Sequence, residues 1–399
     1  MWLQPCLAPT SLRHFYLTKS QLAYSAVTST QSTADRRIRR VASVVNAKVT
    51  AFEQTKAVYV LRIAPSEATA TELFCDRAEE LDRWLAALAG LCVFTEIESD
   101  YKFLHKLGAG TYAEVYAAVE LGTGRHVAVK RIKPSHNETS PGEMTSEISV
   151  LRETQHPGVV QLLKVYETWK DTCLVLSLLP GLSLQRYMSA YGPLGEEKTK
   201  ELLRDLLEIV VYLHGCGVIH RDIKPGNVMV DTRSGRLACK LIDFGLAIKA
   251  ADIQEVNICG TPGYIAPEIL SHQAIGPKAD IFSMGMVAYT ALRGKNPFIH
   301  FDRKTTLSLN QHAQVSFSSP RWTKFSSSLL NLLTRMIAFD PSERLTALEC
   351  LRHPCFAERN ADSVCVKGRC SLFSMQVSDS EISTNGDDRS PAIDISPVP

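Results

Sequence analysis

The sequence predicts an α+β protein with two domains, because strand-like runs and amphipathic helical stretches follow one another along a long chain. Its 399 residues exceed the length of about 250 to 300 residues at which a single hydrophobic core stops growing. Strand-like runs dominate residues 10–66, and apolar residues at helical spacing begin after Asp76. A second domain must therefore follow this first group of elements.

The composition is that of an ordinary globular protein, with 45% apolar and 22% charged residues. A formal charge of +2 gives no strong attraction to nucleic acid, so no nucleic-acid partner is expected. Eleven cysteines without a repeating frame, and no secretory signal, favour reduced thiols and a cytoplasmic location. The longest apolar run, Trp84–Phe94, is shorter than the roughly 20 residues that a membrane helix needs.

The first 95 residues combine several short strands with one amphipathic helix. The strand-like runs are RHFYLT, QLAYSAV, VASVVNAKV, VTAFEQ and AVYVLRIA. The helical pattern that follows carries Trp84 on its apolar face, and Asp76 and Glu79 have the spacing of a capping box. This pattern predicts a small β-barrel or sandwich closed by a C-terminal helix.

The same region, residues 1–95, resembles a pleckstrin-homology (PH) domain, most clearly in AFEQTKAVYVLRIAPS followed by AEELDRWLAAL. The resemblance implies that Trp84 packs the helix onto the core, and that a phosphoinositide or an anionic membrane is a candidate partner. Arg36, Arg37, Arg39 and Arg40 could each contribute about 1 kcal/mol at an anionic surface. A solvated loop explains these arginines equally well, so a peripheral membrane location is an alternative to a purely cytoplasmic one.

The join between the two predicted domains is short. Residues 96–100 are predicted to be a linker, and the ten residues from Gly90 to Ser99 can span at most about 35 Å. The first domain must stay close to the start of the second, which favours a role in covering or positioning it.

The second domain begins with a glycine-containing turn and a lysine on a strand. In KLGAGTYAEVY, Gly108 and Gly110 permit a hairpin whose N–H groups could approach phosphate oxygens. HVAVK then places Lys130 on an alternating strand, and a helical segment provides Glu147 as the carboxylate that could orient it. Glu143, one turn earlier, is the alternative partner.

The chemistry is concentrated in HRDIKPGN, residues 220–227, and in IDFG, residues 242–245. Together with the glycine turn, Lys130 and Glu147, these stretches resemble a eukaryotic protein kinase over residues 101–356. CGTPGYIAPE, PRW and DPSERLTALECLRHPCF resemble the calmodulin-dependent group of serine/threonine kinases most. The resemblance implies a bilobal kinase fold, ATP and Mg²⁺ as cofactors, and protein Ser/Thr hydroxyls as acceptors.

The resemblance also implies a role for each matching residue. Asp222 would accept the proton of the substrate hydroxyl, Lys224 would steady the γ-phosphate, and Lys130 with Glu147 would hold the α- and β-phosphates. Asn227 and Asp243 would bind Mg²⁺. Glu268 and Arg344 would form a buried ion pair. Asp280 would brace the catalytic loop, which is residues 220–227, and His220 would pack beneath the triplet Asp243, Phe244 and Gly245. The substrate and activation segment would include Arg221, Thr261 and Glu268, and the nucleotide contacts would come from Leu107, Gly108, Ala109, Gly110, Thr111, Val115, Ala128, Lys130, Ser177 and Leu179.

The chain departs from that group in the segment after Asp243. Residues 244–260 contain no Ser, Thr or Tyr, and Asn257 stands where many relatives carry a phosphorylated residue. Arg221 therefore has no phosphate to bind, and Glu255 could replace the missing charge only weakly. We expect activity that does not require phosphorylation of this segment.

Two further departures concern substrates and control. Ser183, Gly226 and Thr290 stand where arginine-selecting relatives use acidic residues, which predicts weak preference for basic substrates. The tail 357–399 is rich in Ser, Asp and Pro, reads as disordered, and lacks a basic amphipathic helix for calmodulin.

These observations predict a serine/threonine protein kinase that an N-terminal PH-like domain localises or restrains. The alternatives are a pseudokinase scaffold and a lipid-recruited adaptor.

Overall fold

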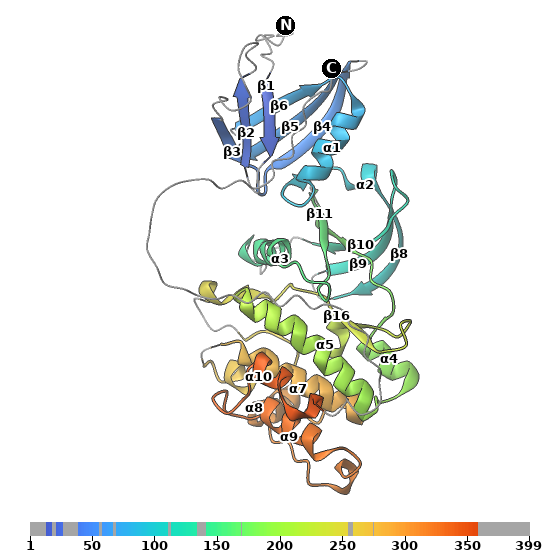
Figure 1. Ribbon diagram of the computed structural model, residues 1–399, viewed down its shortest axis with the longest axis vertical. Coiled ribbons are helices and arrows are strands. Elements are labelled where there is room, and N and C mark those ends of the chain that lie inside the picture. Colours follow the sequence, from blue (N-terminus) through green and yellow to red (C-terminus); the bar gives the residue numbers. More distant parts are fainter. Residues whose placement is uncertain are drawn as a thin grey trace. The chain divides into compact units, whose positions relative to one another are not determined.

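The computed structural model describes residues 13–17, 21–26, 39–55, 58–66, 69–110, 113–133, 141–168, 170–253, 258–273 and 275–357. The chain divides into two compact units (Figure 1). The first unit comprises Met1–Asp100, Lys164–Cys173 and Ser363–Pro399, and the second comprises Tyr101–Leu163 and Leu174–Asp362. Ten residues inside the predicted kinase range, 164–173, thus belong to the first unit.

The first unit holds two groups of antiparallel strands. β1 (Arg13–Leu17), β2 (Gln21–Ala26) and β3 (Arg39–Ser43) form a three-stranded sheet in that order. β4 (Lys48–Thr55), β5 (Val58–Ser66) and β6 (Thr69–Cys75) form a meander in which β5 is central. The buried side chains of the meander, among them Val49, Leu61 and Ile63, are at most 2% exposed and form the core of this unit.

Three details of the predicted N-terminal elements are wrong. VASVVNAKV is not one strand: Asn46 has φ 61°, and this left-handed residue turns the chain between β3 and β4. β6 was not predicted. The helix α1 (Ala78–Leu88) begins after Arg77, which makes no side-chain cap bond, so Asp76 and Glu79 do not form a capping box.

The predicted buried face of α1 is confirmed. Trp84 is 7% exposed and Leu88 is fully buried, and α1 contacts β5 and β6. The arginine-rich insert is described only at Arg39 and Arg40, and only as backbone at the start of β3, so the prediction of lipid contacts falls outside the described side chains.

The segment expected to be a plain linker has its own structure. β7 (Val93–Phe94) pairs in parallel with β4 and with β11 (Leu162–Glu167), and α2 (Ile97–Asp100) follows it. Asp100 accepts hydrogen bonds from the Lys164 ammonium at 3.1 Å and from the Tyr166 hydroxyl. These contacts all lie within the first unit, and they hold residues 93–100 against residues 164–167.

The second unit begins with strands and continues with helices. β8 (Tyr101–Ala109), β9 (Ala113–Glu120), β10 (His126–Ile132) and β12 (Thr172–Ser177) are neighbours in the order β12-β10-β9-β8. The helix α3 (Pro141–Glu153) follows β10 in the chain, and the long helix α5 (Glu196–Gly215) is buried along its apolar face. Two small sheets follow: β15 (Val228–Asp231) lies between β13 (Leu182–Ser183) and β16 (Ala238–Leu241), and β14 (Val218–Ile219) pairs with β17 (Ile248–Lys249). In the chain, β14 directly precedes the catalytic loop and β15 directly follows it.

The helix α7 (Lys278–Arg293) is buried along most of its length because its sequence KADIFSMGMVAYTALR is largely apolar and small, and it contacts α5 and α9 (Ser327–Met336). The other helices in the described part of this unit are α4 (Leu184–Tyr191), α6 (Pro267–Leu270), α8 (Arg303–His312) and α10 (Ala347–Leu351), with single 3₁₀ turns at Pro225–Asn227, Ala250–Asp252, Pro320–Trp322 and Pro354–Phe356.

No helix in the described ranges combines the length and the apolarity that crossing a membrane requires. The eight cysteines that the structure describes are free thiols. The tail predicted to be disordered lies beyond residue 357, outside the described residues.

Candidate active site

Lys130 lies at the centre of an ionic cluster in which its own side chain and that of Glu147 are buried, whereas the side chain of Asp243 is 43% exposed. It sits on β10, opposite Val115 of β9, and its ammonium lies 2.6 and 2.9 Å from the two carboxylate oxygens of Glu147 on α3. The same ammonium lies 2.7 Å from Oδ1 of Asp243. Three residues that are far apart in the sequence are thereby joined, as the sequence predicted for Lys130 and Glu147. The side chain of the alternative, Glu143, lies outside the described part of α3.

Lys130 and Asp243 keep their charges in this cluster, whereas burial raises the pKa of the Glu147 carboxyl above its usual value. Burial disfavours a charged Lys130, but the carboxylates of Glu147 and Asp243 outweigh this effect and raise the pKa of the ammonium above its usual value. Burial also opposes ionisation of Asp243, yet Lys130 lowers the pKa of that carboxyl below its usual value. A fixed cation and a fixed anion therefore face the same space at neutral pH.

Gly245 keeps that space open. A Cβ at this position would lie 3.3 Å from the Lys130 ammonium, 3.4 Å from Oδ1 of Asp243 and 3.6 Å from Oε2 of Glu147. Asn227, in the 3₁₀ turn that ends the catalytic loop, donates its amide N–H to Asp222, so its amide oxygen is the atom that can face a cation. A carboxylate and an amide oxygen are hard ligands suited to Mg²⁺, and the donor set of Asp243 and Asn227 fits that ion.

Asp222 is held by three donors. Its Oδ1 accepts from the Thr261 hydroxyl at 2.6 Å, and its Oδ2 accepts from the Lys224 ammonium at 2.7 Å and from the Asn227 amide at 3.0 Å. Lys224 also donates to the Thr261 hydroxyl at 2.7 Å. A buried carboxylate fixed in this way can orient a hydroxyl group and receive its proton.

The backbone of the catalytic loop is strained and braced. Arg221 and Asp243 have φ values of 65° and 62°, a region that costs non-glycine residues roughly 1–3 kcal/mol each. The fully buried Asp280 on α7 accepts the backbone N–H of His220 at 3.0 Å and of Arg221 at 2.9 Å. The predicted brace from Asp280 to the loop is therefore present.

Two histidines complete this brace. His214 at the end of α5 lies 2.9 Å from Asp280, a contact that sequence reasoning missed. Burial disfavours the charged form of Asp280, but the hydrogen bond from His214 lowers the pKa of that carboxyl below its usual value. His220 packs edge-on against Phe244, with 4.8 Å between ring centroids, as predicted.

The structure describes most of the nucleotide-contacting residues that were predicted around the glycine turn. Gly108 pairs with Val115, and the N–H of Gly110 donates to the Ala113 carbonyl at 2.8 Å. Open space surrounds the position that a Cβ of Gly108 would take, so a ligand can approach this backbone. Leu107 and Ala109 flank it on β8, Ala128 and Lys130 lie on β10, and Thr111 lies outside the described residues.

The predicted nucleotide contacts Ser177 and Leu179 lie at the end of β12 and just beyond it. The N–H of Ser177 already donates to the Gln161 carbonyl at 2.9 Å, and the Ser177 hydroxyl accepts from the Gln161 N–H at 3.1 Å. Leu179 lies two residues beyond the end of β12, and its contact with a nucleotide stays a prediction.

The segment after Asp243 is anchored at both ends. At its first end, Arg221 donates from Nε to the Leu246 carbonyl at 2.6 Å. Ser146 on α3 donates to the Ala247 carbonyl at 3.1 Å, and Lys249 on β17 lies 2.7 Å from Glu153 on α3. Sequence reasoning missed these links. Residues 254–257, which include Glu255 and Asn257, lie outside the described residues.

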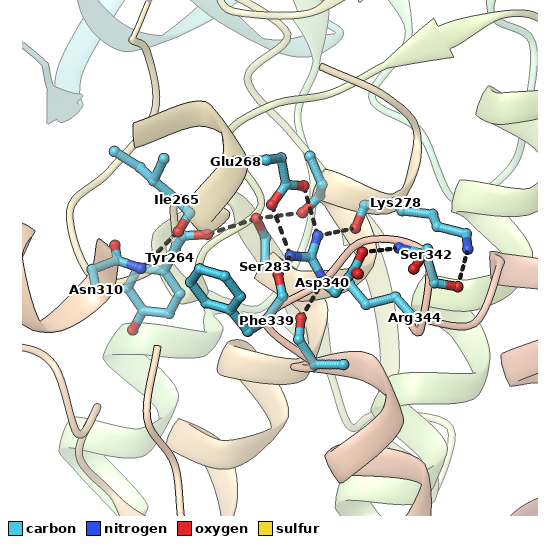
Figure 2. A network of polar contacts seen from close by, with 12 residues as sticks. Tyr264, Ile265, Glu268, Lys278, Ser283, Asn310, Phe339, Asp340, Ser342 and Arg344 are labelled. Carbon is cyan, nitrogen blue, oxygen red and sulfur yellow. Dashed lines mark hydrogen bonds and ion pairs between the residues drawn. The ribbon is translucent and has the colours of Figure 1, made fainter. Parts of the chain in front are cut away.

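The second end is anchored by a buried ion pair (Figure 2). Arg344 donates to both carboxylate oxygens of Glu268, at 2.6 and 2.7 Å, and also to the carbonyls of Lys278 and Phe339. Arg344 is 2% exposed and Glu268 is 4% exposed. The predicted ion pair is present, and it joins α6 to the turn before α10.

Comparisons with known proteins agree with this arrangement. The family described as "Protein kinase domain" matches residues 101–356. The human phosphorylase b kinase gamma catalytic chain, liver/testis isoform, is 32% identical over 293 residues, which cover 70% of each chain. Mouse calcium/calmodulin-dependent protein kinase type IV is 33% identical over 68% of this chain and 56% of its own, and the type 1 enzyme of Macrobrachium nipponense is 32% identical over 65% and 75%.

Proposed function

The chain belongs to the protein kinase family and is a protein serine/threonine kinase near the calmodulin-dependent group, and from this premise we propose how its own residues perform and control phosphoryl transfer. The observation that carries the proposal is the cluster around Asp222, which brings Thr261, Lys224 and Asn227 onto one buried carboxylate. Kinases of this family use ATP and Mg²⁺.

The geometry supports a division of roles. Asp222 orients the acceptor hydroxyl and receives its proton as the oxygen bonds to the γ-phosphorus and ADP leaves. Lys224, which reaches both Asp222 and Thr261, neutralises the transferred group. Lys130, held by Glu147, binds the remaining phosphates. Mg²⁺, when held by Asn227 and Asp243, supplies neutralisation of the phosphate charge.

Radiolabelled ATP transfer to a generic protein tests the role of Asp222. Asp222→Asn keeps the size of the side chain but removes the base, and the rate should fall by about 10²- to 10⁴-fold. The exposed Asp252→Asn is the matched control and should transfer at the wild-type rate. Equal incorporation by Asp222→Asn and wild type would reject the role given to Asp222.

The second part of the proposal is that activity does not require phosphorylation of the segment after Asp243. The guanidinium of Arg221 binds the Leu246 carbonyl, and Lys249 and Ser146 tie the same segment to α3, which carries Glu147. These contacts support an ordered site without a phosphate. Phosphatase treatment should leave the transfer rate unchanged, and an enzyme silenced by this treatment would contradict the proposal.

The third part concerns substrates. Ser183 caps α4 by accepting the Arg186 N–H at 3.3 Å, and the buried Thr290 donates to the Met286 carbonyl at 2.7 Å within its own helix. Gly226 has no side chain. None of these three supplies a carboxylate, which supports weak preference for basic substrates. An oriented peptide array tests this, and a strong arginine requirement three residues before the acceptor would refute it.

The fourth part is that the N-terminal region, which we propose to be PH-like, localises or restrains the kinase. Support comes from the first unit, where β7 pairs with β11 and Asp100 binds Lys164 and Tyr166. Residues 164–167 lie within the range that matches the kinase family, so this region is connected to that range by strand pairing as well as by the chain. Flotation of the full chain with anionic and neutral vesicles separates the two roles, because restraint alone predicts no flotation.

A further inference from the structure

An asparagine on α8 holds the loop that follows Thr261. Asn310 has no exposed surface, although its side chain is polar. Its Oδ1 accepts the backbone N–H of Gly263 at 2.8 Å. Its Nδ2 donates to the carbonyl of Ile265 at 2.6 Å (Figure 2). Both ends of one amide are thus used to fix two backbone groups of the same loop.

Two other buried side chains hold the groups in between. Asn296 donates to the Gly263 carbonyl at 2.9 Å, and Ser283 on α7 donates to the Tyr264 carbonyl at 2.7 Å. Four backbone groups of residues 263–265 therefore have buried side-chain partners. Burying three polar side chains is costly unless each is hydrogen-bonded, and here each of the three forms a hydrogen bond with this loop.

The loop needs this support because its backbone is unusual. Gly263 has φ 93°, and a Cβ there would lie 3.0 Å from Ile299 and 3.3 Å from Asn296. The loop begins two residues earlier at Thr261, whose hydroxyl lies 2.6 Å from the Asp222 carboxylate. A chain that presents its hydroxyl to Asp222 must therefore pass beside this loop.

We propose that Asn310 is a positioning residue for the protein substrate: it fixes the backbone of residues 263–265, against which the acceptor segment lies. This inference rests on the proposed function. Asn310 touches neither the phosphates nor Asp222, so its effect falls on the peptide acceptor. Transfer of phosphate to water does not use the loop in this way and should not depend on Asn310.

The test compares two acceptors in the full-length enzyme. Asn310→Leu keeps the size of the side chain but removes both hydrogen bonds, and Gln311→Leu makes the same chemical change at the next, exposed position of α8. For Asn310→Leu, kcat/KM with a peptide acceptor should fall about 10- to 100-fold through misplacement of the acceptor. Its ATP hydrolysis without peptide and its KM for ATP should stay at wild-type values, and Gln311→Leu should retain all three.

A second variant provides a pH readout that a purely structural role would not give. In Asn310→Asp, burial should raise the pKa of the new carboxyl, and its protonated form can again accept from Gly263 and donate to Ile265. Peptide transfer relative to ATP hydrolysis should therefore recover from about pH 8 toward about pH 6 in this variant. In the wild type the same ratio should not rise as the pH falls.

The outcomes separate this inference from the proposed function. If both activities of Asn310→Leu fall together, including through unfolding, or if neither falls, Asn310 is not a positioning residue and the inference is overturned. A missing pH recovery in Asn310→Asp would also overturn it. If the wild type hydrolyses ATP but phosphorylates no protein or peptide, the proposed function fails instead.

Discussion

The two ends of the segment between Asp243 and Glu268 are anchored by different means. The first end depends on backbone carbonyls and on the Lys249–Glu153 ion pair, whose side chains are 32% and 56% exposed. The second end depends on the Arg344–Glu268 pair, whose side chains are at most 3% exposed, and on the buried Asn310. The first end leads through α3 to Lys130, and the second end leads through Thr261 to Asp222.

The difference teaches where control can act. An exposed ion pair is screened by water and salt and contributes about 0–1 kcal/mol, so the first end can be released at little cost. A buried pair that loses one partner leaves an uncompensated charge, so the second end cannot be released without damage to the fold. We therefore expect regulation of this kinase to act through α3 and the first end.

Removal of Arg344 should break the second end with the largest effect. Arg344→Ala leaves Glu268 buried without its partner, and the free energy of unfolding should fall by about 3–5 kcal/mol. Urea unfolding of the full chain measures the loss. Arg335→Ala, an exposed change on α9, is the control. A loss for Arg344→Ala no larger than that of the control would show that the second end is not a buried anchor.

Acid should destabilise the fold near the first end, because the buried ring of His220 packs against Phe244 and would have to take up a proton there. Burial lowers the pKa of His220 below its usual value, so the unfolded chain binds its proton at a higher pH than the folded chain does. The free energy of unfolding should therefore fall as the pH drops below about 6.5, by up to about 1.4 kcal/mol per pH unit for this proton.

The pH effect is measured as the slope of unfolding free energy against pH for the wild type and for His220→Phe. The variant keeps an aromatic ring against Phe244 but cannot bind a proton, so its slope should be smaller. His156, whose pKa burial also lowers, accounts for part of the remaining slope. Equal slopes in the two proteins would show that His220 does not contribute to the pH dependence of the unfolding free energy.

The smallest effect is expected for the ion pair at the first end. Lys249→Ala should change the free energy of unfolding by about 0–1 kcal/mol, less at high salt. Hydrogen exchange of the α3 amides should nevertheless become faster, because one tie between β17 and α3 is lost. Lys249→Arg should retain wild-type exchange. Unchanged exchange in Lys249→Ala would mean that the Ser146 and Arg221 contacts hold the first end alone.

Local sequence patterns were sufficient for much of the site. The contacts of Lys130 with Glu147, of Asp280 with the catalytic loop and of Arg344 with Glu268 were all predicted, because the family motifs place these residues at spacings that only one fold satisfies. The buried face of α1 follows from helical periodicity in the same way.

The turn at Asn46, the strand β6 and the pairing of β7 had little or no local signal in the sequence. Asn46 ends a run of strand-forming residues because its side chain tolerates φ 61°, and a single asparagine gives little warning of this. β6 was missed because the alternating pattern of TATELFC is short and directly precedes a helix. The pairing of β7 with both β4 and β11 joins three segments that are distant in the sequence, which no local pattern can reveal.

The sequence by itself determined which residues we propose for the chemistry, namely Lys130 for the phosphates, Asp222 as the base, and Asn227 with Asp243 for the metal ion, and it also showed a segment with no hydroxyl residue between Phe244 and Gly260. Only the tertiary structure decided how that segment is held. Lys249, Ser146 and Asn310 look like ordinary surface or helix residues in the sequence. Their roles come from partners 45 to 101 positions away, and contacts over such separations are set by the packing of whole elements rather than by local spacing.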